Sequence, residues 1–264
     1  MKLRKHPVAK FDVYQRRKSQ LLKKVLVVCH RYDKKRPLKV PHCMFTRPHK
    51  TFFLFNANVD AHEAVLRFNY APTKGYEKDV GNKTTLRVVN NRVVFESKFV
   101  EEMSITGEYL PLVSWREGPY NANMYKWYRD GKSVFCQYVK WYYKYPFLPI
   151  HMLRLETIWK LWDVVQEFTT EELNAIPLSS GSVGIFLMMS ICETVDVYGF
   201  VSRKDESYCY YYKDCPEGIT LREKNHPIDA ERNLLGRLHQ GDEKDIVEKH
   251  KVTVKGYSVY KCKK

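Results

Sequence analysis

Glycine is absent from the first 74 residues of this 264-residue sequence, and no run of apolar residues approaches the roughly 18 needed to span a bilayer. We therefore expect membrane association only through an anchor that is not visible in this chain. The longest early apolar patch, residues 25–28, is also too short for the core of a signal peptide. Internal repeats and low-complexity segments are lacking as well.

The sequence contains no CxxC pair and no Cys/His spacing typical of zinc sites, so the common structural zinc motifs are excluded and we expect no metal site. Seven cysteines are scattered along the chain: Cys29, Cys43, Cys136, Cys192, Cys209, Cys215 and Cys262. Such scatter fits either free thiols or a few long-range disulfides. Their spacing alone does not choose between the two.

Positive charge is concentrated at one end of the sequence. Residues 1–50 hold 16 Lys/Arg against two acids, a net charge of +14, whereas residues 51–264 hold 29 against 28, a net of +1. A basic segment of this kind admits a nucleic-acid or anionic-membrane partner. Because no nucleic-acid-binding motif accompanies the charge, we favour a solvated arm or stem and expect no nucleic-acid partner.

The hydrophobic pattern divides the chain into a basic arm, residues 1–50, and one globular domain, residues 51–264. Three prolines in 31–50 indicate an extended tether. In the globular part the patterns predict strands at 64–69 and 195–200, a turn-rich loop at 71–84, and two short strands within 85–100 on either side of Asn90-Asn91. They also predict helices at 156–168, 179–195 and 229–241, the last closed by a glycine. Strand–loop–helix–strand units of this kind predict an α/β fold with a mainly parallel sheet.

Three short stretches carry candidate chemistry. Ser179-Ser180-Gly181 precedes an apolar helix, where free amides and two hydroxyls suit an anion, although an ordinary serine cap explains the same residues. The tyrosines at 210–212 fit either an edge strand or a pocket mouth. His226 stands five residues before Glu231 at the start of a helix, an arrangement that by itself favours a structural role.

Four segments in this order nevertheless resemble the animal sialyltransferases, and the resemblance covers about residues 55–264. They are DAHEAVLRFNYAPTKGYEKDVGNKTTLRVVN (60–90), PLSSGSVGIFLMMSICETVDVYGF (177–200), CYYYK (209–213) and HPIDAE (226–231). YKWYRDG (125–131) and LWDVVQE (161–167) are similar to the β-galactoside α-2,6-sialyltransferases. The resemblance implies a single domain with a GT-A-like, Rossmann-type fold, located in the Golgi lumen. It also implies a reaction that transfers sialic acid from CMP-sialic acid to galactose-terminated glycans, with inversion of the anomeric centre and without a metal.

The same resemblance implies a role for each matching residue. His226 becomes the general base that deprotonates the acceptor hydroxyl, because a histidine accepts a proton near neutral pH. Glu231 orients this histidine or holds the loop that carries it. Tyr210 approaches the departing phosphate, where a hydroxyl stabilises charge as it develops. The nucleotide is expected to contact four residues: Asn69, Ser179, Ser180 and Gly181.

The resemblance also implies a pairing for six of the cysteines. Cys43 with Cys192 would join the long and short family motifs, and Cys209 with Cys215 would close a local loop. Cys29 with Cys262 would tie the front of the domain to its C-terminus, leaving Cys136 unpaired. Each bridge would stabilise the fold by about 2–4 kcal/mol, and all three require an oxidising compartment.

One region departs from the family pattern. Residues 43–59 should hold a hydrophobic strand followed by a Gly/Ser-rich loop against the donor, yet this segment contains neither glycine nor serine. Bulky side chains do not allow a backbone to approach a ligand as glycine does. Asn225 also replaces the aromatic residue that precedes the base in the closest subgroup. A catalytically impaired protein that binds nucleotide or glycan is therefore the alternative to an active transferase.

Overall fold

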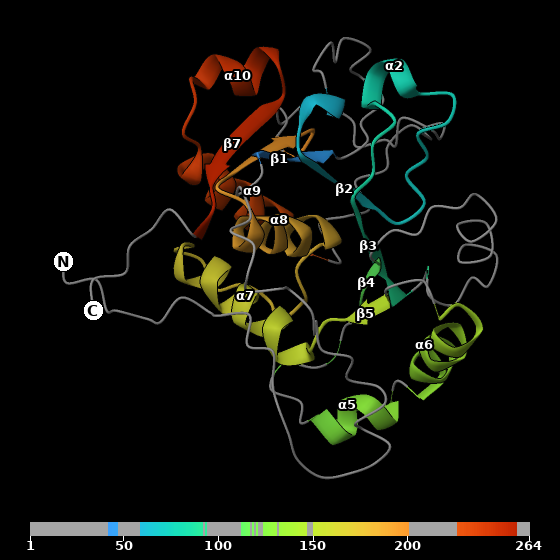
Figure 1. The fold of residues 1–264 in the computed structure, drawn as a ribbon. Helices are drawn as coiled ribbons and strands as arrows, with labels where there is room; N and C mark the ends of the chain where they lie inside the picture. Colours follow the sequence, from blue (N-terminus) through green and yellow to red (C-terminus); the bar gives the residue numbers. More distant parts are fainter. Residues whose placement is uncertain are drawn as a thin grey trace, which may run out of the picture.

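The computed structural model describes residues 42–46, 59–91, 93, 112–116, 118, 120, 124–130, 132–146, 150–200 and 226–257. These residues build one seven-stranded sheet in the order β5-β4-β3-β2-β1-β6-β7 (Figure 1). The strands are β1 (His42–Thr46), β2 (Ala64–Phe68), β3 (Leu86–Asn90), β4 (Leu112–Trp115), β5 (Ile150–Met152), β6 (Thr194–Tyr198) and β7 (Lys251–Lys255). All neighbouring pairs are parallel except β6 and β7. The expected α/β class with a mainly parallel sheet is confirmed.

Helices cover the sheet and supply its core. They are α2 (Glu77–Val80), α5 (Met124–Asp130), α6 (Lys132–Lys144), α7 (Leu155–Glu167), α8 (Ser180–Ile191), α9 (Ile228–Leu238) and α10 (Glu243–Glu248), with a 3₁₀ turn at Val59–Ala61. Figure 1 shows α7, α8 and α9 gathered together, with α5 and α6 toward the β5 end and α10 beside β7. Among the described helices, none is long and apolar enough to cross a membrane.

The strand pattern explains why the sheet is buried on both faces. The sequences of β2, β3 and β6 are rich in valine and other apolar residues, which is typical of parallel strands covered on two sides. On β6, Val195 and Val197 join the main core with α8, whereas Tyr198 packs on the opposite face against Val59 and Val65. The predicted strands at 64–69 and 195–200 and the helix at 156–168 are therefore confirmed.

Strand β1 lies within residues 31–50, which the sequence predicted to be an extended tether. Residues 42–46 pair in parallel with both β2 and β6, so they occupy the interior of the sheet although they lie before the predicted domain boundary at residue 50. The flanking prolines, Pro41 and Pro48, indicated extended chain, but they stand outside the strand and remove no ladder donor from it. Residues 1–41 of the basic arm lie outside the described residues.

Two further local predictions need correction. The second strand expected within 85–100 is wrong at its start, because the chain is helical at Asn91 and Val93; residues 94–100 lie outside the described part. Helix α9 ends at Leu238, with His239 as its C-cap, rather than at Gly241. There the chain turns toward β7, since Gln240 N donates to Thr253 O (2.8 Å) and Thr253 N donates to the His239 ring (3.0 Å). Tertiary hydrogen bonds, and not a glycine, end this helix.

Candidate functional site

Residues from four elements meet where β2, β3 and β4 end and α8 begins. Asn90 and Trp115 are paired in the register of β3 and β4, and both close their strands. Trp115 Nε1 donates to Ser180 Oγ at the first residue of α8 (3.0 Å). In parallel α/β sheets ligands bind at the carboxyl ends of the strands, and this edge therefore carries the candidate site.

Ser179 caps helix α8, and its single hydroxyl hydrogen is already donated within the protein. Its Oγ accepts from Ser182 N (3.2 Å) and donates to Glu231 Oε2 (2.6 Å), and the residue is 2% exposed. Capping of this kind satisfies one of the amides that a helix leaves unpaired at its start. Among the predicted donor-binding residues, Ser179 thus acts through the helix it begins.

Glu231 binds the start of α8 from the neighbouring helix α9. It is 1% exposed, and its carboxylate accepts from Ser179 N (2.7 Å), Ser179 Oγ (2.6 Å) and Ser182 Oγ (2.7 Å). The negative charge lies at the positive end of the α8 dipole, which favours its burial. Within the described residues no hydrogen bond joins Glu231 to His226, so the carboxylate holds the helix end and not the imidazole.

The imidazole of His226 is oriented by a backbone carbonyl. Its Nδ1 lies 2.8 Å from Pro177 O, and because a carbonyl oxygen only accepts, this nitrogen carries the hydrogen. Nε2 then keeps its lone pair and, in the described part of the chain, has no partner. The ring is partly buried immediately before α9, and Pro177 lies two residues before Ser179. The sequence-predicted base and the start of α8 are therefore neighbours.

Asn69 is held at the end of β2 in a left-handed backbone conformation (φ 45°), which asparagine tolerates better than most residues. Its Oδ1 accepts from Asn90 N (3.0 Å), and its backbone oxygen accepts from Arg87 Nη1 (2.7 Å). These bonds fix the residue at the same sheet edge as Trp115. Among the described residues the side-chain amide hydrogens of Asn69 have no partner, and they are the groups with which Asn69 can meet a ligand.

Ser180 and Gly181 supply the remaining predicted contacts. Their backbone amides have no hydrogen-bond partner among the described residues, as expected for the first turn of a helix. A Cβ at Gly181 would lie 2.5 Å from Phe200 Cε2, so close packing against Phe200 is sufficient reason for glycine here. The resemblance had attributed this glycine to the nucleotide loop, and the structure adds a packing requirement.

Several predicted residues fall outside the described part. Tyr210, Cys209 and Cys215 lie in the segment 201–225, and Cys29 and Cys262 lie near the two ends of the chain. Cys192 is disulfide-bonded, and the side chain of its partner is outside the described residues. Cys136 is a free, exposed thiol on α6, which agrees with its being left unpaired in the predicted scheme.

Two residues at this edge were missed from the sequence. Arg232 follows Glu231 on α9 and donates from Nε to Phe200 O (3.2 Å), which places a largely buried cation beside the residue that packs on Gly181. Trp115 was not singled out, and no strand was predicted around it. A predicted strand at 112–115 would have been the signal, because strand ends line sites in this fold class.

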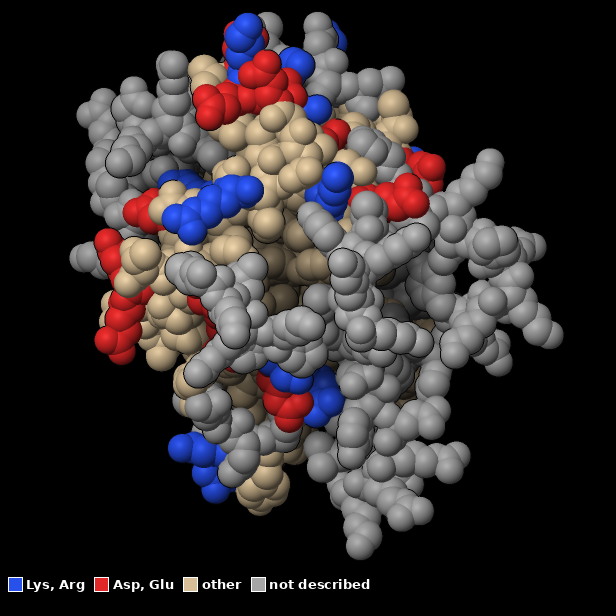
Figure 2. Space-filling model, turned by 90° about the vertical axis from the view of Figure 1, so that its left-hand side faces the viewer, with Lys and Arg blue, Asp and Glu red and all other residues tan. Residues whose placement is uncertain are grey.

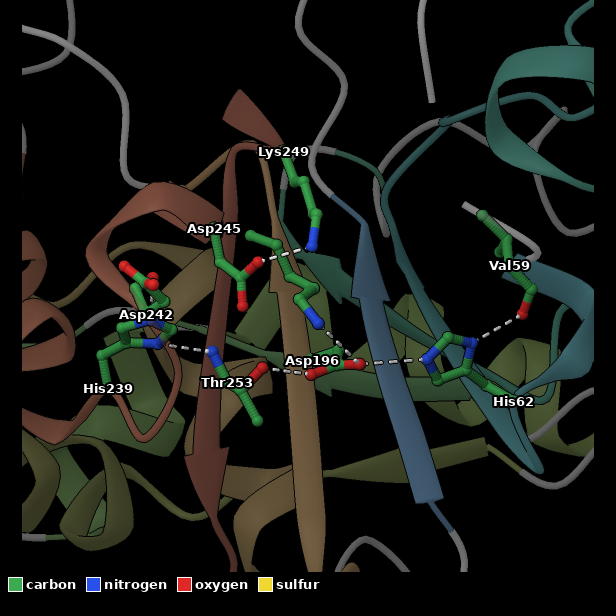
Figure 3. A network of polar contacts seen from close by, with 9 residues as sticks. Val59, His62, Asp196, His239, Asp242, Asp245, Lys249 and Thr253 are labelled. Atoms are coloured by element: carbon green, nitrogen blue, oxygen red, sulfur yellow. Dashed lines mark hydrogen bonds and ion pairs between the residues drawn. The ribbon is translucent and has the colours of Figure 1, made fainter. Parts of the chain in front are cut away.

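A second histidine–carboxylate pair lies on the opposite face of the sheet (Figure 3). Asp196 on β6 contacts His62 Nε2 (3.3 Å) and accepts from Thr253 Oγ1 on β7 (2.5 Å), while His62 Nδ1 lies 3.2 Å from Val59 O. Both ring nitrogens of His62 are therefore engaged, unlike those of His226. This network joins strands and leaves no nitrogen for a substrate.

Charged side chains of both signs are interspersed on the described part of one face of the molecule (Figure 2). At α10, Lys249 Nζ and Asp245 Oδ1 form an ion pair at 2.7 Å (Figure 3). Their hydrogen bond raises the pKa of Lys249 and lowers that of Asp245. Because the pair is exposed, it contributes little to stability.

Comparison with known proteins gives the family. Residues 56–242 match the model of glycosyltransferase family 29 (sialyltransferase). Beta-galactoside alpha-2,6-sialyltransferase 2 of Rattus norvegicus is 39% identical over 207 residues, and that of Homo sapiens 38% over 207 residues. Each alignment covers 77% of this chain but 39% of the relative, so the chain spans about two fifths of the length of these proteins.

Solved structures agree at the level of the fold. A crystal structure of a mammalian sialyltransferase in complex with Gal-beta-1-3GalNAc-ortho-nitrophenol aligns with a TM-score of 0.54 and 18% identity, covering 82% of this chain and 74% of that one. At this identity the likeness supports the architecture alone. The family match, by contrast, extends over more than half of the sequence. The chain therefore belongs to glycosyltransferase family 29, the sialyltransferases.

Proposed function

We propose that this chain transfers sialic acid from CMP-sialic acid to terminal galactose of glycans, in α-2,6 linkage, with inversion and without a metal. The observation that carries the proposal is the His226 ring, tied through Nδ1 to Pro177 O beside the start of α8. Family membership supports the reaction class, and the names of the relatives support the acceptor and linkage. A GT-A-like architecture is part of the same proposal.

The proposed reaction assigns one task to each side of the site. His226 Nε2 accepts the proton of the acceptor hydroxyl while the acceptor oxygen bonds to the anomeric carbon of sialic acid. The bond from that carbon to the CMP phosphate breaks on the opposite face, and the electron pair leaves with the phosphate. Free amides at the start of α8 and the amide of Asn69 would bind the nucleotide, and Tyr210 would approach the leaving oxygen.

The proposed setting is the Golgi lumen. Cys192 is disulfide-bonded, and structural disulfides persist in oxidising compartments such as the secretory pathway. The proposed partner of Cys192 is Cys43, which lies on β1 directly beside β6. The pairs Cys209–Cys215 and Cys29–Cys262 remain predictions from the family resemblance.

A second candidate function is binding of nucleotide or glycan without catalysis. Its motivation is the segment 43–59, where bulky and basic residues stand in place of the family's Gly/Ser-rich loop. The preceding hydrophobic strand of the family pattern is present as β1, so the departure is confined to the residues after this strand. Residues 47–58 lie outside the described residues.

A transfer assay separates these functions. The purified 264-residue chain is incubated with CMP-sialic acid, a galactose-terminated disaccharide and a chelator, and the product linkage is determined. We expect sialyl transfer that His226→Ala lowers by about 10²–10⁴-fold, because the acceptor hydroxyl loses its base. His239→Asn, a histidine outside the site, should leave the rate unchanged.

Calorimetry with CMP completes the test. Binding without turnover by the folded chain would favour the second candidate, whereas absence of CMP binding would exclude the transferase and the nucleotide-binding form of the second candidate. His226→Ala should still bind CMP, because the ring is proposed to act on the acceptor and not on the nucleotide.

A further inference from the structure

We propose that Trp115 is a positioning residue that fixes the Ser180 hydroxyl as a hydrogen-bond donor to a phosphate oxygen of the bound nucleotide. This inference rests on the proposed function and adds a residue that the family motifs do not include. It concerns the direction of the hydrogen bond between Trp115 and Ser180, which follows from which of the two groups can donate and which can accept.

The indole of Trp115 determines the orientation of this hydroxyl. Trp115 is 3% exposed, and its Nε1 lies 3.0 Å from Ser180 Oγ. An indole N–H donates and never accepts, so Ser180 Oγ must accept this bond. The hydroxyl hydrogen then points away from the indole. Within the described residues it has no other partner, and Ser180 is partly exposed.

The two neighbouring serines act as hydrogen-bond donors within the protein, whereas Ser180 accepts from Trp115. Ser179 and Ser182 both donate their hydroxyl hydrogens to the Glu231 carboxylate. Ser180 alone, among the three serines at the start of α8, keeps its hydrogen for a ligand. Together with the unpaired amides of Ser180 and Gly181 it forms a set of three donors.

A set of donors at the positive end of a helix favours an anionic oxygen, such as that of a phosphate, over a neutral group that both donates and accepts hydrogen bonds. Donation by Trp115 also polarises the hydroxyl and strengthens it as a donor. Without the indole N–H, the Ser180 hydroxyl could rotate to accept from nearby amides. Its lone pairs would then face the phosphate, which would weaken binding of the anion specifically.

Two ligands that differ by one phosphate test this inference. Calorimetry measures the affinity of wild type and Trp115→Phe for CMP and for cytidine. We expect CMP affinity to fall about three- to tenfold, the value of one hydrogen bond to a charged group after partial relaxation. Cytidine affinity should change less than about twofold, because cytidine has no phosphate to meet the hydroxyl.

Three variants control for loss of packing. Trp159→Phe removes an equally buried indole N–H that donates to Gly118 O (3.1 Å), and it should alter neither affinity. Ser180→Ala should reproduce the CMP-selective loss. Adding Trp115→Phe to Ser180→Ala should cause no further loss, because the two changes remove the same interaction.

Each outcome of these measurements supports or overturns the proposed role of Trp115. Equal losses for CMP and cytidine would make Trp115 merely structural, and an unchanged CMP affinity would overturn the inference as well. Wild-type protein that binds neither ligand would instead overturn the proposed function, and the inference with it. If Trp115→Phe does not fold, benzothienylalanine at position 115 replaces the N–H by sulfur at nearly constant shape and makes the same comparison.

Discussion

A buried carboxylate holds the start of α8, and its three hydrogen bonds explain how a charge is tolerated there. Glu231 is almost fully buried, yet it accepts from one amide and two hydroxyls and lies at the positive end of a helix. Removing the charge while keeping the shape leaves donors without an acceptor, and unsatisfied buried groups are costly. The spacing from His226 placed Glu231 in the first turn of α9. Its partners belong to another helix.

Glu231→Gln should therefore destabilise the protein. The glutamine amide offers one oxygen in place of two, so at least one of the three donors loses its acceptor. We expect the free energy of unfolding, measured with urea, to fall by about 1–3 kcal/mol. Asp229→Asn is the matched control, because Asp229 is in the same turn but its side chain is 76% exposed and its contact with Arg232 is long, at 3.8 Å. An equal effect of the two changes would contradict the role of Glu231.

Helix α8 packs directly against side chains of the sheet, and its glycines make this contact possible. Gly181 and Gly184 are three residues apart, on one face of the helix. A Cβ at Gly184 would lie 2.6 Å from Phe68 Cε1, as one at Gly181 would meet Phe200. Both phenylalanines are buried and cannot move aside without disturbing the core. The approach of α8 places its first turn at the strand ends.

Gly184→Ala should lower the free energy of unfolding by about 1–3 kcal/mol, because the added methyl overpacks the contact with Phe68. Gly236→Ala on α9 makes the same chemical change where nothing lies within 4 Å of the new Cβ. There we expect a gain of about 0.4–1 kcal/mol from reduced freedom of the unfolded chain. Thermal and urea unfolding of the two variants measure the expected loss of stability for Gly184→Ala and the expected gain for Gly236→Ala. A stabilised Gly184→Ala would refute the close packing.

Strand β1 lies between β2 and β6 and makes the seven-stranded sheet continuous. This strand pairs with β2 on one side and β6 on the other, so the sheet is continuous only because residues 42–46 insert between them. Cys43 is paired with Val195 in the register, three residues after Cys192 at the end of α8. A disulfide between these cysteines would fasten β1 to the start of β6.

We expect Cys192→Ser to lower the free energy of unfolding by about 2–4 kcal/mol under oxidising conditions, and to abolish the sensitivity of the wild type to reductant. Cys136→Ser, at a free and exposed thiol, should do neither. Peptide mapping without reduction should recover Cys43 joined to Cys192. Recovery of Cys192 with any other cysteine would disprove this pairing.

The local patterns that the sequence revealed are those that depend on backbone geometry. The apolar stripe of α7 follows the helix period, and the apolar strands β2 and β6 follow from runs of neighbouring residues. The serine that starts α8 follows from cap chemistry. These features need only neighbouring residues. The four ordered segments that resemble sialyltransferases likewise indicate the family from the sequence alone.

The sequence alone determined the family, the fold class and the positions of His226 and Glu231 relative to their helix, because each depends on residues close together in the chain. The partners of these residues depended on folding. Glu231 meets Ser179 across 52 residues, Trp115 meets Ser180 across 65, and β1 enters the sheet despite the prolines around it. Such contacts are chosen by packing and by the need to satisfy buried polar groups, and no local periodicity encodes that choice.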